Sequence, residues 1–194
     1  DGAFHLVVNG GGHLCIHYKK EGYLPLCRFV DTPWQDHAWL PDVALISVDP
    51  QVTPIDLNSP APVQVARGSV VKDDDGERQA TVFIPQGTRA EMILPDKSLK
   101  ALDSIKVRIT EYTVGPNGPA AMPAALPPSS AYTYAFELSA DEVIADGIKV
   151  AGKDLILNQP LLVFVENFLK FPVGTPMPMG YFDNDKAAWI ASEN

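Results

Sequence analysis

The sequence predicts an all-β protein made of two β-sandwich domains with one short helix. Eighteen prolines and fourteen glycines are spread along the 194 residues and separate short apolar segments. Proline ends helices and both residue types favour turns, so this spacing excludes long helices. Several of the short segments alternate apolar and polar residues, which is typical of strands with one buried face. A hydrophobic content of 46% is sufficient for packed cores.

The first predicted domain covers residues 1–49. Alternating residues predict a three-stranded meander, because the run NGGG at residues 9–12 and the glycine in KEG at 20–22 supply the turns. The expected strands lie at residues 3–8, 13–18, 23–30 and 43–48. The chain starts with a turn pair, Asp1-Gly2, that leads directly into an apolar segment, which predicts a fragment of a longer chain.

A linker is predicted at residues 50–62, because this segment holds four prolines and little apolar pattern. The second domain is expected to cover residues 63–194. Its central strand is expected at 161–165, where five consecutive apolar residues are typical of a buried strand. The other expected strands lie at 63–71, 79–84, 92–94, 105–112, 132–138, 179–182 and 187–191, with a hairpin at 149–157. Five prolines predict an extended, polyproline-like surface loop at 115–130.

One short helix is expected to follow the strand at 132–138. Ser139 precedes Glu142 by three residues, which is the spacing of a capping box in which each residue satisfies a backbone amide of the other. The helix is expected to reach Ala145 and to stop at Gly147. This role accounts for Asp141 and Glu142 without acid–base chemistry.

Charge and hydropathy narrow the classes of partner. The net charge is -9 and the pI is near 4.8, with no local cluster of basic residues, so nucleic acid is a poor partner. No apolar run approaches the roughly 20 residues that cross a bilayer, so no membrane span is expected.

The two cysteines allow three interpretations. His13, Cys15 and His17 lie on one face of a predicted strand and Cys27 lies nearby, which suggests a zinc site; however, same-face residues are roughly 6.6 Å apart and rarely converge on one ion. A cross-strand disulfide between Cys15 and Cys27 is the second interpretation, and it implies an oxidising compartment. Two free thiols are the third.

No other motif predicts catalysis, a metal or a cofactor. The run DDDG at residues 73–76 lacks the alternating order of a calcium loop and is better explained as a solvated turn. No nucleophile elbow or phosphate-binding loop is present. Trp34 and Trp39 are candidate contacts for a sugar or a partner chain, together with Tyr112, although a role in which the tryptophans cap the end of the first sandwich is the favoured interpretation. We therefore expect no enzyme, with an enzyme site at His13 and His17 as the remaining alternative.

Two blocks of the sequence resemble a known family. The first comprises DGAFHLVVNGGG, KKEGYLP and PWQD, and it resembles the carboxypeptidase-regulatory-like, transthyretin-like sandwich that precedes the shell in teneurins and in bacterial proteins with RHS or YD repeats. The second resembles the segment that follows this sandwich in the bacterial proteins, and its IPQGT portion is also similar to the sandwich domain of ankyrins and netrin receptors. It comprises RGSVV, QATVFIPQGT, TEYTVGPNGPAAMP, YTYAFELSADE and VENFLKFPVGTPMPMGYFD.

The resemblance implies a non-catalytic structural module of a secreted or cell-surface protein, often a toxin carrier or adhesin. Its partner would be the remainder of its own polypeptide, a hollow shell of YD repeats, or another protein. The family assigns no catalytic residue to this region, and the YD repeats themselves are missing here. The resemblance also implies that the first sandwich lacks its opening strands, because Asp1-Gly2 falls in mid-domain in the family; those strands belong to another part of the chain, or the domain leaves a sheet edge open. An extracellular module that binds carbohydrate or protein is the alternative function.

Overall fold

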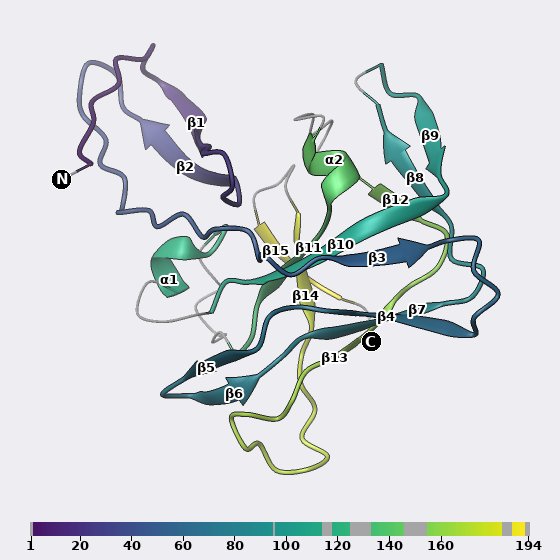
Figure 1. Cartoon of the computed structure of the whole chain (residues 1–194). Helices are drawn as coiled ribbons and strands as arrows, with labels where there is room; N and C mark the ends of the chain where they lie inside the picture. Colours follow the sequence, from purple (N-terminus) through teal and green to yellow (C-terminus); the bar gives the residue numbers. More distant parts are fainter. Residues whose placement is uncertain are drawn as a thin grey trace.

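The computed structural model describes residues 2–94, 96–113, 118–124, 133–145, 155–183 and 188–192, and it is all-β, which confirms the predicted class (Figure 1). Two short helices are described, α1 (Gly118–Ala121) and α2 (Asp141–Ala145). The strands are β1 (Gly12–Tyr18), β2 (Leu26–Thr32), β3 (Thr53–Asp56), β4 (Val63–Arg67), β5 (Val71–Asp73), β6 (Gly76–Arg78), β7 (Thr81–Pro85), β8 (Ala90–Ile93), β9 (Leu99–Leu102), β10 (Ser104–Glu111), β11 (Phe136–Ala140), β12 (Leu155–Leu157), β13 (Leu162–Phe164), β14 (Gly180–Asp183) and β15 (Ala188–Ala191).

The strands form small antiparallel sheets. Three sheets have three strands each, in the orders β11-β10-β3, β12-β8-β9 and β13-β7-β4. Three two-stranded ribbons, β1-β2, β5-β6 and β14-β15, complete the pairing among the described residues. The centre of the first sheet is β10, in which Ile105, Val107 and Ile109 are buried and Lys106 is exposed, as the alternation of the sequence predicts. The expected polar face does not continue to the end of the strand, because Thr110 is buried.

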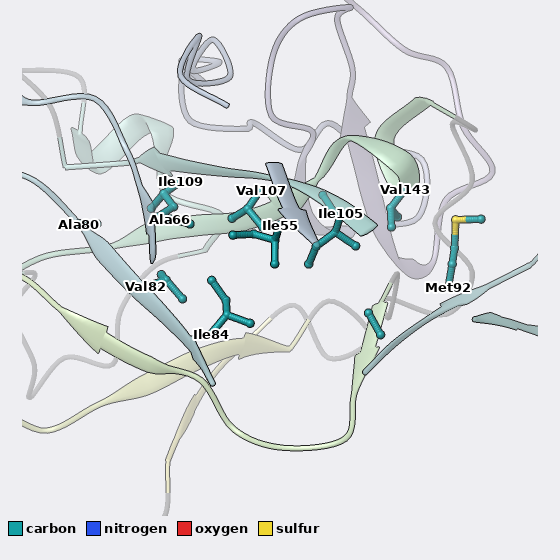
Figure 2. Packing of buried hydrophobic residues seen from close by; sticks show 12 residues of the cluster. Ile55, Ala66, Ala80, Val82, Ile84, Met92, Ile105, Val107, Ile109 and Val143 are labelled. Atoms are coloured by element: carbon teal, nitrogen blue, oxygen red, sulfur yellow. The ribbon is translucent and has the colours of Figure 1, made fainter. Parts of the chain in front are cut away.

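The main core lies between the sheets β11-β10-β3 and β13-β7-β4. Figure 2 shows Val82 and Ile84 of β7 facing Ile55 of β3 and Val107 of β10 across this core. These residues are 5% exposed or less, and burying each aliphatic side chain stabilises the fold by about 1.5–3 kcal/mol. The two sheets are therefore held together by side chains at alternate positions of β3, β7 and β10.

The linker predicted at residues 50–62 is not unstructured throughout. Residues 53–56 form β3, which pairs with β10 and places Ile55 opposite Ile105. Pro54 is compatible with this position because β3 lies at the edge of its sheet, where an amide can be missing without loss of a ladder bond. The linker prediction relied on the prolines of this segment and did not take account of Ile55, whose side chain is buried in the main core.

The segment predicted as the central strand is an edge strand. β13 pairs only with β7, and its three residues are all exposed. Local apolar content predicted burial correctly for the flanking Leu161 and Val165, which are partly buried against the main core. The prediction of a central strand was wrong because nothing among the described residues covers the outer side of β13.

The predicted meander at the start of the chain is reduced to one ribbon. β1 and β2 pair along their whole length, whereas residues 3–8 and 43–48 form no strand; Tyr23 and Ser47 make an isolated bridge. A strand needs a neighbouring strand for its backbone hydrogen bonds, and alternation of apolar and polar residues does not provide one. The apolar side chains at positions 4, 6, 7 and 8 are accordingly exposed.

The capping box predicted at Ser139 is also wrong. Ser139 lies within β11 opposite Arg108, and its hydroxyl oxygen is buried without a hydrogen-bond partner. The Glu142 carboxylate instead accepts from the backbone amide of Lys106 at the start of β10. Helix α2 nevertheless runs to Ala145 as predicted.

The loop and strands predicted near the gaps are only partly within the described residues. Helix α1 lies inside the loop predicted at 115–130, and residues 115–117 and 125–130 of that loop lie outside the described part. Residues 149–154 of the predicted hairpin also lie outside it, and β12 pairs with β8.

A second, smaller core joins the two predicted domains. Leu24 packs with Tyr112, Met122 and Ala135, and the partly buried residues around this cluster are Ile46, Val48 and Trp189. The Arg28 guanidinium donates to the carbonyls of Ala120, Met122 and Pro123, at 2.6–3.0 Å. The first 49 residues thus contact the second unit through apolar side chains and through charge-assisted hydrogen bonds. The division of the chain into domains at this point stays a prediction.

Candidate functional site

The β1–β2 ribbon carries both cysteines. The register places Cys15 opposite Phe29 and Cys27 opposite His17, so the cysteines are diagonal neighbours and not directly opposite. Their sulfur atoms are bonded in the structure, and the Cα atoms are 5.9 Å apart, a separation that a disulfide can span. The diagonal pairing in solution is a proposal that peptide mapping can test.

We expect a non-reducing peptide map of protein purified without reductant to contain one peptide pair linked through Cys15 and Cys27. The loop between them spans a sequence separation of 12, and closing a loop of that size restricts the unfolded ribbon by about 3 kcal/mol. Replacing both cysteines with serine should lower the unfolding free energy of the ribbon by a similar amount in urea titrations. Rapid alkylation of both thiols in the untreated protein would contradict the pairing.

The histidines of β1 have separate partners. His13 stacks on Phe29 with ring centroids 4.7 Å apart, and its Nδ1 lies 2.7 Å from Oδ1 of Asp31. His17 Nε2 lies 3.3 Å from the Cys15 sulfur. Within the described ranges, no group of three or more His, Cys, Asp or Glu side chains is placed to hold a metal ion.

The three residues predicted as ligand contacts do not come together. Trp34 and Trp39 are 71% and 86% exposed in the loop after β2, so neither caps a sandwich. Tyr112 is instead buried in the second core, where burial and then the nearby Glu137 carboxylate raise the pKa of its phenol. The tryptophans remain candidate contacts, whereas Tyr112 is not on the surface that they occupy.

A buried ion-pair network that the sequence reasoning missed lies at the β5–β6 ribbon. The Arg78 side chain is 1% exposed, and its Nη1 and Nη2 donate to the two carboxylate oxygens of Asp73, each at 2.8 Å. Its Nε donates to Oε1 of Glu111 at 2.7 Å, and the guanidinium lies 4.6 Å from the ring centroid of Phe168. One cation thus links the ribbon, the end of β10 and the chain after β13.

One sequence signal could have found this network. Glu111 follows Ile105, Val107 and Ile109 at the same two-residue spacing, so it continues the buried face of β10. A buried carboxylate needs a cation or several donors, because desolvation of an unpaired charge is costly. Asp73, which was expected in a solvated turn, shares that cation with Glu111.

The hydrogen bonds from Arg78 lower the pKa of Asp73 to about 2, from an ordinary value of 3.8, and a smaller opposing effect comes from burial. A carboxylate with a lowered pKa stabilises the folded state above its unfolded pKa and loses that contribution as the pH falls toward its folded pKa. The stabilisation is therefore complete above about pH 4 and lost between about pH 4 and pH 2.

We expect an Asp73→Asn variant to flatten this acid-side slope. Thermal unfolding of the parent chain and the variant should differ most above about pH 4 and converge toward pH 2. Asp74→Asn, at the exposed neighbouring aspartate that makes no contact with Arg78, provides the matched control. A constant difference between parent and Asp73→Asn across this range would contradict the lowered pKa.

The segment from Leu162 to Tyr181, which we call the exposed segment, carries most of the uncovered apolar surface of the second unit. Leu162 is 67% and Phe164 is 54% exposed. Figure 1 shows that the chain after β13 runs as a long loop beyond the sheets. The large apolar side chains exposed in this segment are Leu162, Val163, Phe164, Leu169, Phe171, Val173, Met177, Met179 and Tyr181.

The exposed segment continues an apolar sheet face. The register aligns Val65 of β4 with Phe83 of β7 and with Leu162 of β13 in one row across the sheet. Val63 and Val65 are also exposed. A large contiguous apolar surface of this kind is more often a protein–protein contact site than a surface that stays exposed to solvent.

Comparison with known proteins gives one match. Residues 1–45 match the family model of the teneurin TTR-like domain. No curated protein and no solved structure matches the chain. The match indicates a teneurin TTR-like region in the first part of the chain and, since that domain is structural, a non-catalytic structural module of a larger protein. None of the described helices is long and apolar enough to cross a membrane.

Proposed function

We propose that the chain is a structural and interaction module of a large secreted or cell-surface protein of the YD/RHS-repeat type. In this role it packs on, or plugs, the shell of repeats formed by the remainder of its own polypeptide, and it performs no catalysis. The TTR-like match over residues 1–45 supports a module that accompanies such a shell. The bonded cysteines are compatible with an oxidising compartment outside the cytosol.

The observation that carries the proposal is the exposure of β13 and of the chain after it. An edge strand presents unpaired backbone groups, and β13 adds exposed apolar side chains on both of its faces. Such an edge promotes aggregation when it meets water and is normally covered. A wall of the larger protein that pairs with or packs on β13 would cover it.

The test is a photocrosslinking experiment in the longest natural polypeptide that contains this sequence. A benzophenone side chain replaces Leu162, and the matched control carries it at Lys72, an exposed position on β5. We expect irradiation to link position 162 to a segment outside these 194 residues and position 72 to give little product. Equal, low yields at both positions would contradict packing through β13.

A second candidate function is binding of an extracellular carbohydrate or protein ligand through Trp34 and Trp39. The exposure of both indole rings favours it, because indoles stack readily on sugar rings. A glycan array probed with the parent chain and with Trp34→Ala should show a glycan that binds only the parent. An array without any hit, or a variant that binds as the parent does, removes this candidate.

A further inference from the structure

A cavity of about 380 Å³, partly open to solvent, lies where the first 50 residues meet the second unit. The lining residues include all of residues 44–50 and the end of β10 at residues 109–111. Tyr23 and Tyr134 contribute phenol rings, while Ile46, Val48 and Val71 contribute aliphatic surface. Among the described residues, none from the exposed segment and neither tryptophan lines this cavity.

The charged side chains that line the cavity are both carboxylates. Asp49 is fully engaged: its oxygens accept from the amide and hydroxyl of Ser69 and from the amide of Gln51, each at 2.7 Å. Glu111 is different. Its Oε1 accepts from Arg78 and from the hydroxyl of Thr113, whereas its Oε2 receives no hydrogen bond from any described residue.

The free oxygen belongs to a side chain that is 6% exposed. Ser139 Oγ is the one side-chain oxygen among the described residues that is fully buried without a partner, so Glu111 Oε2 is accessible and can accept a donor that enters from solvent. Arg78 does not neutralise both carboxylates, because its single positive charge is shared between Glu111 and Asp73. The cavity side of Glu111 therefore keeps net negative charge and unused acceptor capacity.

Tyr134 presents a second unused polar group. Its ring packs against Phe136 and Phe168, and no described residue hydrogen-bonds its hydroxyl. Burial raises the pKa of this phenol, and the carboxylates of Glu111, Glu166 and Asp49 raise it further against the opposing charge of Arg78. Tyr23 is engaged on its ring by Lys20, whose Nζ lies 4.1 Å from the centroid.

We propose that this cavity binds a primary ammonium group on an alkyl chain, either a lysine side chain or a free alkylamine. The ammonium supplies donors for Glu111 Oε2 and for the hydroxyl oxygen of Tyr134. The alkyl chain lies against Ile46, Val48 and Val71. A guanidinium fits less well, because its fork needs both carboxylate oxygens and Oε1 is taken. A divalent metal needs more free oxygen ligands than this wall offers.

The test uses NMR titration of the full chain with n-butylamine, with N-acetyl-lysine-methylamide and with n-butanol as the uncharged isostere. We expect both amines to shift the resonances of Tyr134 at millimolar concentration and n-butanol to shift them at least tenfold more weakly, which corresponds to one charge-assisted hydrogen bond. Tighter binding of the lysine derivative assigns the site to a protein side chain, and tighter binding of n-butylamine assigns it to a free amine.

Two variants separate this site from nonspecific charge attraction. Tyr134→Phe removes only the hydroxyl and should weaken amine binding about tenfold, whereas Tyr181→Phe, at an exposed tyrosine elsewhere, should leave it unchanged. The Glu111→Gln variant, if it folds, should not bind the amines. If it does not fold, the amine affinity of Tyr134→Phe alone tests the proposal. Equal shifts with amine and alcohol, or equal affinities of the two tyrosine variants, would overturn the proposal and leave water as the occupant. The proposal does not depend on the structural role proposed above.

Discussion

Replacing Arg78 with leucine is expected to lower the free energy of unfolding by about 3–5 kcal/mol, because removal of one partner leaves buried carboxylates uncompensated. Glu111 is the more deeply buried of the two acids, with a side chain that is 6% exposed. Loss of the guanidinium also removes the contact with Phe168, which ties the chain after β13 to the β5–β6 ribbon. Urea unfolding of the parent and the variant measures the difference.

The matched control is Lys72→Ala. Lys72 and Glu77 face each other on the same β5–β6 ribbon, but their side chains are 78% and 62% exposed. Exposed ion pairs contribute about 0–1 kcal/mol, so this variant should unfold almost as the parent does. If Arg78→Leu costs no more than Lys72→Ala, the buried network does not stabilise the fold.

Replacing Ile55 with alanine is the second large effect that we expect, at about 2–5 kcal/mol of unfolding free energy. Ile55 is 2% exposed and packs with residues of β7 and β10 in the main core. Deleting its outer carbon atoms leaves a cavity between two sheets that can close only partly. Chemical denaturation followed by circular dichroism measures the loss.

Val173→Ala provides the comparison for Ile55→Ala, because Val173 is fully exposed in the exposed segment. Surface truncations of this kind usually change stability by less than about 0.5 kcal/mol. Equal stabilities of the two variants would mean that Ile55 does not stabilise the main core. Residues 50–62 would then be a linker, as their proline content alone predicted.

The sequence predicted burial best where the residues of a single strand alternate between apolar and polar. The two-residue alternation of β10 predicted burial of Ile105, Val107 and Ile109 but not of Thr110, and the frequent prolines and glycines predicted the all-β class. Patterns of this kind are local, since they depend only on which face of a strand meets the core. The capping box at Ser139 was also a local pattern, yet pairing of β11 with β10 took that residue into a strand.

Features that depend on distant residues could not be predicted in the same way. Five apolar residues at 161–165 indicate that something covers them, but they do not say whether the cover belongs to this chain. In the structure β13 lies at an edge and is exposed. The contact between Arg78 and Glu111 and the ammonium cavity likewise join residues more than 30 positions apart. The spacing of Glu111 in β10 can indicate that its carboxylate is buried, but it does not say which cation pairs with it.

The central claim is that the exposed segment is covered in the larger protein, and the four methionines of the chain allow a direct measurement. Met177 and Met179 lie in that segment and are exposed, whereas Met92 and Met122 are buried in the two cores. Peroxide should oxidise the exposed pair much faster in the isolated chain, because thioether oxidation follows exposure. Within the longer natural polypeptide, we predict that Met177 and Met179 become as slow as Met92 and Met122. Unchanged fast oxidation of Met177 and Met179 there would contradict the account.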